Sequence, residues 1–226
     1  MCNNKIMKKF APKETMAYLK FLRGLKIARR KTKRLVAVVM IGLVGSGKSS
    51  VARAIAAEIG GTVIEADAIR MKLRDLGAGY DKVRQIAEAA AREVFARRGN
   101  LVIDSDFVDG ARRKSAAAFL RKAGARIYYV RVIAEGDIMI GRTVYNAPSL
   151  FFRGATTNWR GSERERGAVV KLREFWRRTP RHYIWNPKSG GNWKLKPIAA
   201  SIAATIDTTD GKSWRKAAAR LAKKLI

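Results

Sequence analysis

An apolar run followed at once by a glycine-rich turn is the feature that most constrains this chain. Residues 35–41 (LVAVVMI) are all hydrophobic, which is typical of a strand buried on both faces. Residues 42–49 (GLVGSGKS) then complete the pattern G-x-x-x-x-G-K-S. Residues 49–59 carry apolar side chains at helical spacing and stop at Gly60 and Gly61. The sequence therefore predicts a strand, a glycine loop and a helix in succession.

Each position of this loop suits the binding of nucleotide phosphates. Glycines let the backbone turn tightly with its amides pointing inward, and the following helix directs its positive end at the same point. Lys48 can place its charge on the β and γ phosphate oxygens, and Ser49 can ligate Mg²⁺. The predicted nucleotide-binding residues are Gly42, Gly45, Ser46, Gly47, Lys48, Ser49 and Ser50.

Strand and helix patterns alternate along the rest of the chain. Short apolar segments predict further strands at 62–66, 101–103, 126–133 and 198–206. Helical spacing predicts helices near 67–76, 81–98, 110–123, 136–144, 162–176 and 211–225. This alternation is typical of an α/β fold with a mainly parallel sheet, here of about five strands.

Two acidic positions follow predicted strands and are candidates for chemistry. Asp104 ends the strand at 101–103, where a carboxylate is needed to order a metal ion; the alternative is a helix cap or turn residue, as expected for Asp106 and Asp109. Asp67 and Arg70 are three residues apart, so they share a helix face. This carboxylate could accept a hydroxyl proton while the guanidinium holds a phosphate. A capping aspartate with a surface arginine fits the spacing equally well.

The same segments carry a resemblance to a known family. Residues 63–73 (VIEADAIRMKL), placed behind the glycine loop, and residues 101–107 (LVIDSDF) with Arg112 and Arg113 resemble small P-loop kinases of the polynucleotide kinase and zeta-toxin type. The resemblance covers about residues 35–145 and 198–226. It implies a three-layer α/β/α P-loop NTPase fold.

The resemblance also implies roles for particular residues. Asp67 matches the general base for a hydroxyl acceptor, and Arg142 matches the start of a lid whose arginines stabilise the transferred phosphoryl group. Arg153 is a looser lid candidate. Residues 146–196 depart from the family pattern and are interpreted as a basic lid or substrate insertion in a domain spanning 35–226, so the acceptor is not named.

The chain is strongly basic, with a formal net charge of +30 over 226 residues. Residues 1–34 hold twelve lysines and arginines against one glutamate, and residues 147–196 hold twelve against three. Such an excess indicates polyanionic surroundings, although generally basic proteins in the source organism would also explain it. Residues 14–30 are predicted as an amphipathic helix of an N-terminal extension, which could contact nucleic acid or an anionic membrane surface, or dock on the core.

Tryptophans interleave with the cations of the second basic segment. Aromatic faces beside arginines can stack bases and neutralise phosphates, so nucleic acid is a possible partner. For Trp176 we favour packing at helical spacing with Phe175; for Trp159, Trp185 and Trp193 packing and base stacking are left equally open.

These observations converge on an expected function. We expect a Mg²⁺-dependent kinase that moves the ATP γ-phosphate to a hydroxyl of a nucleic-acid 5′ end or a small metabolite. The alternative is a nucleic-acid-binding NTPase that hydrolyses ATP to water. Cys2 is the only cysteine and His182 the only histidine, which excludes a Cys/His zinc site. His182 is expected to be a surface or packing histidine. No membrane span or secretory signal is indicated, so a cytoplasmic protein is expected.

Overall fold

The computed structural model describes residues 10–145, 168–188 and 191–226. The elements in chain order are α2 (Pro12–Arg23), β1 (Val36–Ile41), α3 (Lys48–Ile59), β2 (Gly61–Glu65), α4 (Ala66–Asp75), α5 (Val83–Ala96), β3 (Asn100–Asp104), α6 (Gly110–Lys122), β4 (Arg126–Ile133), α7 (Gly136–Tyr145), α8 (Ala168–His182), β5 (Tyr183–Asn186), β6 (Asn192–Leu195), β7 (Ile202–Asp207) and α9 (Ser213–Leu225). None of the helices in these ranges is long and apolar enough to cross a membrane.

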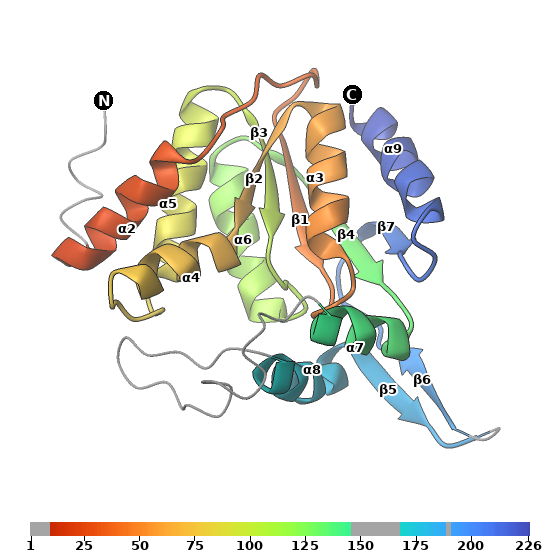
Figure 1. The fold of residues 1–226 in the computed structure, drawn as a ribbon. Helices are drawn as coiled ribbons and strands as arrows, with labels where there is room; N and C mark the ends of the chain where they lie inside the picture. Colours follow the sequence, from red (N-terminus) through yellow and green to blue (C-terminus); the bar gives the residue numbers. More distant parts are fainter. Residues whose placement is uncertain (1–9, 146–167, 189–190) are drawn as a thin grey trace.

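A parallel sheet of five strands in the order β2-β3-β1-β4-β7 forms the centre of the molecule. Every residue of β1 is buried, because helices cover both faces of the sheet (Figure 1). The three-layer α/β/α fold and the five-stranded sheet expected from the sequence are therefore confirmed.

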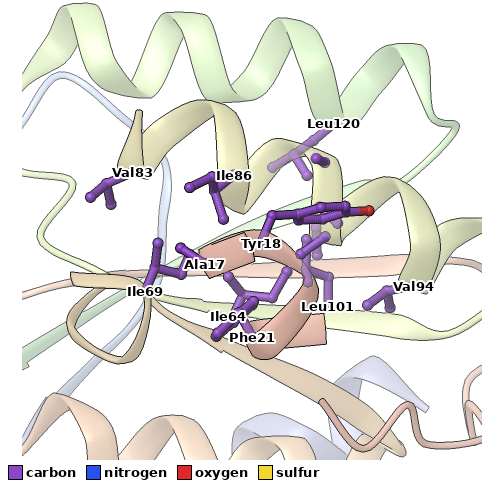
Figure 2. Close-up of a cluster of buried hydrophobic side chains, with 14 of the residues drawn as sticks. Ala17, Tyr18, Phe21, Ile64, Ile69, Val83, Ile86, Val94, Leu101 and Leu120 are labelled. Atoms are coloured by element: carbon purple, nitrogen blue, oxygen red, sulfur yellow. The ribbon is translucent and has the colours of Figure 1, made fainter. Parts of the chain in front are cut away.

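Successive residues of β1 point into two different cores, as strand geometry requires. Val36, Val38 and Met40 pack with α3 and α9. Ala37 and Val39 face the larger cluster, to which α2, α4, α5 and α6 contribute. Figure 2 shows this second cluster around the Tyr18 ring.

The N-terminal helix belongs to this larger core. Ala17, Tyr18 and Phe21 of α2 are buried against α4 and α5. Of the three contacts considered for this segment, with nucleic acid, with a membrane surface or with the core, the structure therefore contains the contact with the core. The helix begins at Pro12 and ends at Arg23 before Gly24, earlier than the predicted end at residue 30. The residues that follow the helix connect it to β1, and in this segment Lys31 N donates to Ile59 O at the end of α3.

Three boundaries differ from the prediction in the C-terminal third. Helix α8 continues through Pro180 to His182, because a proline in the last turn removes only one helical hydrogen bond; the predicted start at residue 162 lies outside the described residues. Strand β7 begins at Ile202 rather than 198. The antiparallel β5–β6 hairpin was not predicted at all.

Candidate active site

The glycine loop connects β1 to α3 at the carboxyl end of the sheet, and its shape depends on missing side chains. Gly45 and Gly47 both have φ of +80°, a backbone conformation that favours glycine. A Cβ atom on Gly42 would lie 2.5 Å from Val132 O, and one on Gly45 would lie 2.3 Å from Met139 O. The loop is therefore wedged between β4 and α7, with no room for larger residues.

Lys48 lies buried at the start of α3. Its Nζ donates to Leu43 O at 3.1 Å, so the ammonium group folds back over the loop. Burial lowers its pKa, while the carboxylates of Asp104, Asp106 and Asp67 act in the opposite direction. A buried cation surrounded by loop amides is well placed to exchange the Leu43 carbonyl for phosphate oxygens.

Ser49 and Asp104 supply two oxygen donors next to each other. Asp104 ends β3 and forms a hydrogen bond with the Ser49 side chain. Burial raises the pKa of Asp104, and the Ser49 hydrogen bond and the charge of Lys48 partly offset that rise. A buried carboxylate beside a hydroxyl fits a hard divalent cation such as Mg²⁺.

The protein alone does not provide a full metal cage. Within the described ranges, no group of three or more His, Cys, Asp or Glu side chains could hold a metal ion. Mg²⁺ in nucleotide-binding sites commonly takes one or two protein ligands and completes its shell with phosphates and water.

A second pair of residues joins the same strand exit to α8. His182 is 1% exposed, and its Nε2 lies 3.1 Å from Asp106 Oδ2. Asp106 Oδ1 accepts from Gly42 N at 3.5 Å and from Val108 N at 3.2 Å. Burial by itself would raise the pKa of Asp106, but His182 and Lys48 outweigh it and the pKa is lowered.

Asp106 was expected as a turn residue. It also connects the glycine loop to the end of α8, through its contacts with Gly42 N and His182 Nε2. Asp109 does act as a helix cap, since its carboxylate accepts from Arg112 N.

Asp67 and Arg70 lie on one face of α4, as their spacing predicted. Arg70 Nη1 donates to Asp67 Oδ1, and the Asp67 side chain is 79% exposed. On the neighbouring strand, Glu65 accepts from Arg53 at 2.9 Å. Two carboxylate–guanidinium pairs thus line the cleft on the side of α4.

One cleft of about 830 Å³ brings these groups together. Of the predicted site residues, those that line the cleft are Gly42, Gly45, Gly47, Lys48, Ser49, Ser50, Asp67, Arg70, Asp104 and Arg142. Ser46 is fully buried, and its hydroxyl makes no hydrogen bond within the described part of the chain. Arg153 and Trp159 lie outside the described residues.

A family model described as an AAA domain matches residues 38–145, which span the glycine loop, Asp67 and Asp104. The fold also matches that of a candidate kinase from Chloroflexus aurantiacus J-10-fl, with 16% sequence identity and a TM-score of 0.54. That alignment covers 86% of this chain and 100% of the other. The chain is thus similar to an AAA domain over residues 38–145, and it has the three-layer fold of P-loop NTPases.

Two further solved structures have lower TM-scores. A gluconokinase from Sinorhizobium meliloti 1021 is 21% identical, with coverage of 87% and 95% of the two chains and a TM-score of 0.47. An APS kinase from Mycobacterium tuberculosis, in complex with AMPPNP and APS, is 17% identical, with coverage of 84% and 96% and a TM-score of 0.46. No curated protein sequence matches the chain.

Arg142 lies at the end of the cleft formed by the loop after β7. Its guanidinium donates to Thr208 Oγ1 at 2.8 Å and also to Thr208 O and Gly45 O. These contacts hold Arg142 between the glycine loop and the last loop of the sheet. The position differs from that of a lid arginine placed only over the transferred phosphate.

Several residues of the cleft were not predicted from the sequence. They are Arg53, Glu65, Arg112, Glu174, Arg178, Thr208, Trp214 and Arg215. Arg178 is close enough to Lys48 to contribute to lowering its pKa, and its Nε donates to Glu174 Oε2 at 2.8 Å. Arginines were visible at 173, 177, 178 and 181, but the helix was predicted to end at residue 176, so nothing indicated which of these side chains faces the loop.

Three tryptophans of the described C-terminal residues, Trp176, Trp185 and Trp193, are exposed to half or more. Trp176 is 56% exposed, whereas Phe175 beside it is 3% exposed, so the favoured packing of Trp176 is wrong and Phe175 takes the buried position. Trp185 and Trp193 are each 50% exposed and contact one another. His182, expected at the surface or in packing, is buried and hydrogen-bonded.

Proposed function

We propose that this protein transfers the γ-phosphate of ATP to a hydroxyl group. The observation that carries the proposal is the single cleft lined both by the glycine loop and by Asp67 of α4. A hydrolase needs only a positioned water beside the phosphates. An additional carboxylate–arginine pair on the far side of the cleft favours an organic acceptor over water.

The phosphate side of the reaction is assigned to the loop and two basic residues. The loop amides and Lys48 hold the β and γ phosphates. Arg178, kept in the cleft by Glu174, stabilises negative charge on the transferred group. Arg142 is hydrogen-bonded to Thr208 and holds the glycine loop in place at the nucleotide end of the cleft.

Mg²⁺ is assigned to Ser49 and Asp104, whose side chains are hydrogen-bonded to each other. When bound, this ion neutralises phosphate charge. Asp104 must be ionised to serve, and Lys48 and the Ser49 hydroxyl both favour its ionised form. Burial still leaves the pKa of Asp104 above its usual value, because these partners offset its desolvation only in part.

Asp67 is assigned as the general base on the acceptor side. Its carboxylate takes the proton from the acceptor hydroxyl as that oxygen attacks the γ-phosphorus. Arg70, which donates to Oδ1, orients the carboxylate. The acceptor hydroxyl can belong to a small metabolite or to a nucleic-acid 5′ end, and the experiment below separates the two.

The test follows γ-³²P-labelled ATP and Mg²⁺ with nucleosides, sugars, a 5′-hydroxyl oligonucleotide and water as competing acceptors. Label should enter an organic product. Asp67→Asn should reduce product formation about 100-fold or more while leaving ATP affinity unchanged, since a positioned base contributes ~10²–10⁴ to the rate. Lys48→Ala should reduce both ATP affinity and turnover, because it removes the charge that holds the phosphates.

Asp75→Asn is the matched control, since Asp75 is an exposed aspartate at the other end of α4 and should leave both quantities unchanged. Release of labelled phosphate alone, in the presence of every acceptor, would assign the protein to the hydrolases. Full transfer activity in Asp67→Asn would remove Asp67 from the base role.

A further inference from the structure

The β5–β6 hairpin carries an aromatic pair that the cleft does not use. Trp185 and Trp193 are directly opposite each other in the antiparallel register, so both side chains lie on the same face of the hairpin. Their ring centroids are 5.3 Å apart, with an interplanar angle of 65°. Each is half exposed. In Figure 1 the two strands extend away from the central sheet.

The aromatic pair is held in place by the hairpin itself. A Cβ atom on Gly191, which has φ of +81°, would lie 2.2 Å from the Trp185 ring, so the indole packs directly against the turn backbone. At the other end, the buried Arg131 of β4 donates to Lys196 O at 2.7 Å and to His182 O at 3.0 Å. Both strands are thus anchored to the sheet, so little conformational entropy is lost when a ligand binds.

The charge around the hairpin selects the kind of partner. The sequence between Glu174 and Asp207 contains no acidic residue. The cations of this stretch, exposed or half-buried in the structure, are Arg177, Arg178, Arg181, Lys188, Lys194 and Lys196. A partner must therefore be anionic, and a second copy of this chain is disfavoured by repulsion between like charges.

We propose that the β5–β6 hairpin binds single-stranded nucleic acid, with bases stacked on Trp185 and Trp193 and backbone phosphates on the neighbouring cations. Exposed indoles in a stretch that carries six cations and no acidic residue suit this ligand, because every base offers a stacking face and every phosphate a charge. A duplex keeps its bases stacked inside, so its faces are not accessible to the indoles.

An anionic membrane is a poorer partner for the same surface. Within the described residues β5 and β6 form a two-stranded sheet, so each strand has an outer edge of unpaired backbone groups. Such an edge cannot be lowered into hydrocarbon without losing its hydrogen bonds to water. Asn186 and Asn192, which are hydrogen-bonded to each other near the tip, add to this cost.

The test compares two oligonucleotides of equal length and charge, one of deoxythymidine and one of abasic units. Binding is followed by fluorescence anisotropy without ATP, at a salt concentration high enough to suppress general attraction to the basic surface. The wild-type protein should bind the thymidine strand about 5- to 150-fold more tightly, since each stacked base contributes ~1–3 kcal/mol.

Trp185→Ala with Trp193→Ala should abolish this preference and leave the affinity for the abasic strand unchanged. The variant with Trp185→Phe and Trp193→Phe should keep most of the preference for the thymidine strand. That result would show that the loss in the double Ala variant does not come from misfolding. Tyr145→Ala is the matched control because Tyr145 is an 89% exposed aromatic on α7; it should change nothing. ATP-dependent activity with acceptors other than the oligonucleotide should be the same in all of these variants, so failure here leaves the proposed function standing.

Equal wild-type affinity for the two strands would overturn the proposal and leave only attraction between a basic protein and polyanions. A preference that persists in the double Ala variant would place the stacking residues elsewhere. Tighter binding to vesicles with anionic headgroups than to the thymidine strand would assign the hairpin to a membrane surface instead.

Discussion

Asp104 and Asp106 are two residues apart at the end of β3, yet the fold changes their acidity in opposite directions. Burial raises the pKa of Asp104, and its hydrogen bond with Ser49 only partly compensates. Asp106 is also desolvated, but His182 and Lys48 more than offset that effect and lower its pKa. The two carboxylates thereby acquire different surroundings: Asp104 lies beside Ser49, whereas Asp106 contacts His182 at the end of α8.

The Asp106–His182 contact predicts a pH-dependent contribution to stability. Because the folded state lowers the pKa of Asp106, its contribution is present above the unfolded value of about 4 and is lost as the pH falls through the folded value. At pH 6 we expect Asp106→Asn to lower the free energy of unfolding by about 1–3 kcal/mol. The difference from wild type should shrink between pH 5 and pH 3, as measured by urea unfolding at each pH.

A His182→Gln background provides the control for this prediction. Without its main partner, Asp106 should contribute less, so substituting it should produce a smaller change with pH. A constant difference between the wild type and Asp106→Asn at every pH would mean that the contact does not shift the titration of Asp106.

At the scale of elements, packing decides which segments belong to the core. Helix α2 lies against α4 and α5 and contributes Ala17, Tyr18 and Phe21 to the buried cluster. The basic residues of the same helix remain at the surface. An amphipathic, positively charged helix can therefore stabilise the fold with one face while its charges stay in water.

Tyr18 provides the test of this packing. It is 1% exposed, whereas Met16 on the same helix is 46% exposed. Tyr18→Ala should lower the free energy of unfolding by about 3–5 kcal/mol, as expected for truncation of a buried aromatic ring. Met16→Ala, the matched control, should change it by less than about 0.5 kcal/mol. Equal effects in chemical denaturation would show that α2 does not contribute to the cooperative core.

At the scale of the whole molecule, the net charge of +30 opposes compaction. Within the described residues, the ion pairs are few, and most of them lie on exposed side chains. Such pairs contribute little to stability. Most of the positive charge therefore remains as repulsion between cations that the fold brings close together.

Added salt should reduce this repulsion. Because the Debye length is about 10 Å at 0.1 M ionic strength, we expect Tm to rise by several degrees as NaCl increases from low concentration to ~0.3 M. Differential scanning calorimetry would measure the change. Lys48→Ala should show the same rise, since the effect comes from the whole surface rather than from anion binding at the loop. A Tm that falls with salt would contradict the expectation.

What the sequence determined was local. Gly42 to Ser49 follow one another along the chain, so the loop, the strand before it and the helix after it could be predicted together. Asp104 at the end of a strand, and Asp67 with Arg70 three residues later, followed from the same short-range geometry. The alternation of apolar segments was also sufficient to predict the parallel sheet.

What only the tertiary structure decided were the contacts between distant segments. Arg142 meets Thr208 across 66 positions, and Asp106 meets His182 across 76. Periodicity shows which face of a helix is apolar, but not which neighbour that face meets or which arginine points into the cleft. The glycine loop is therefore encoded by its own residues, whereas the cleft around it, including Arg178 and the hairpin beside it, depends on how the elements pack.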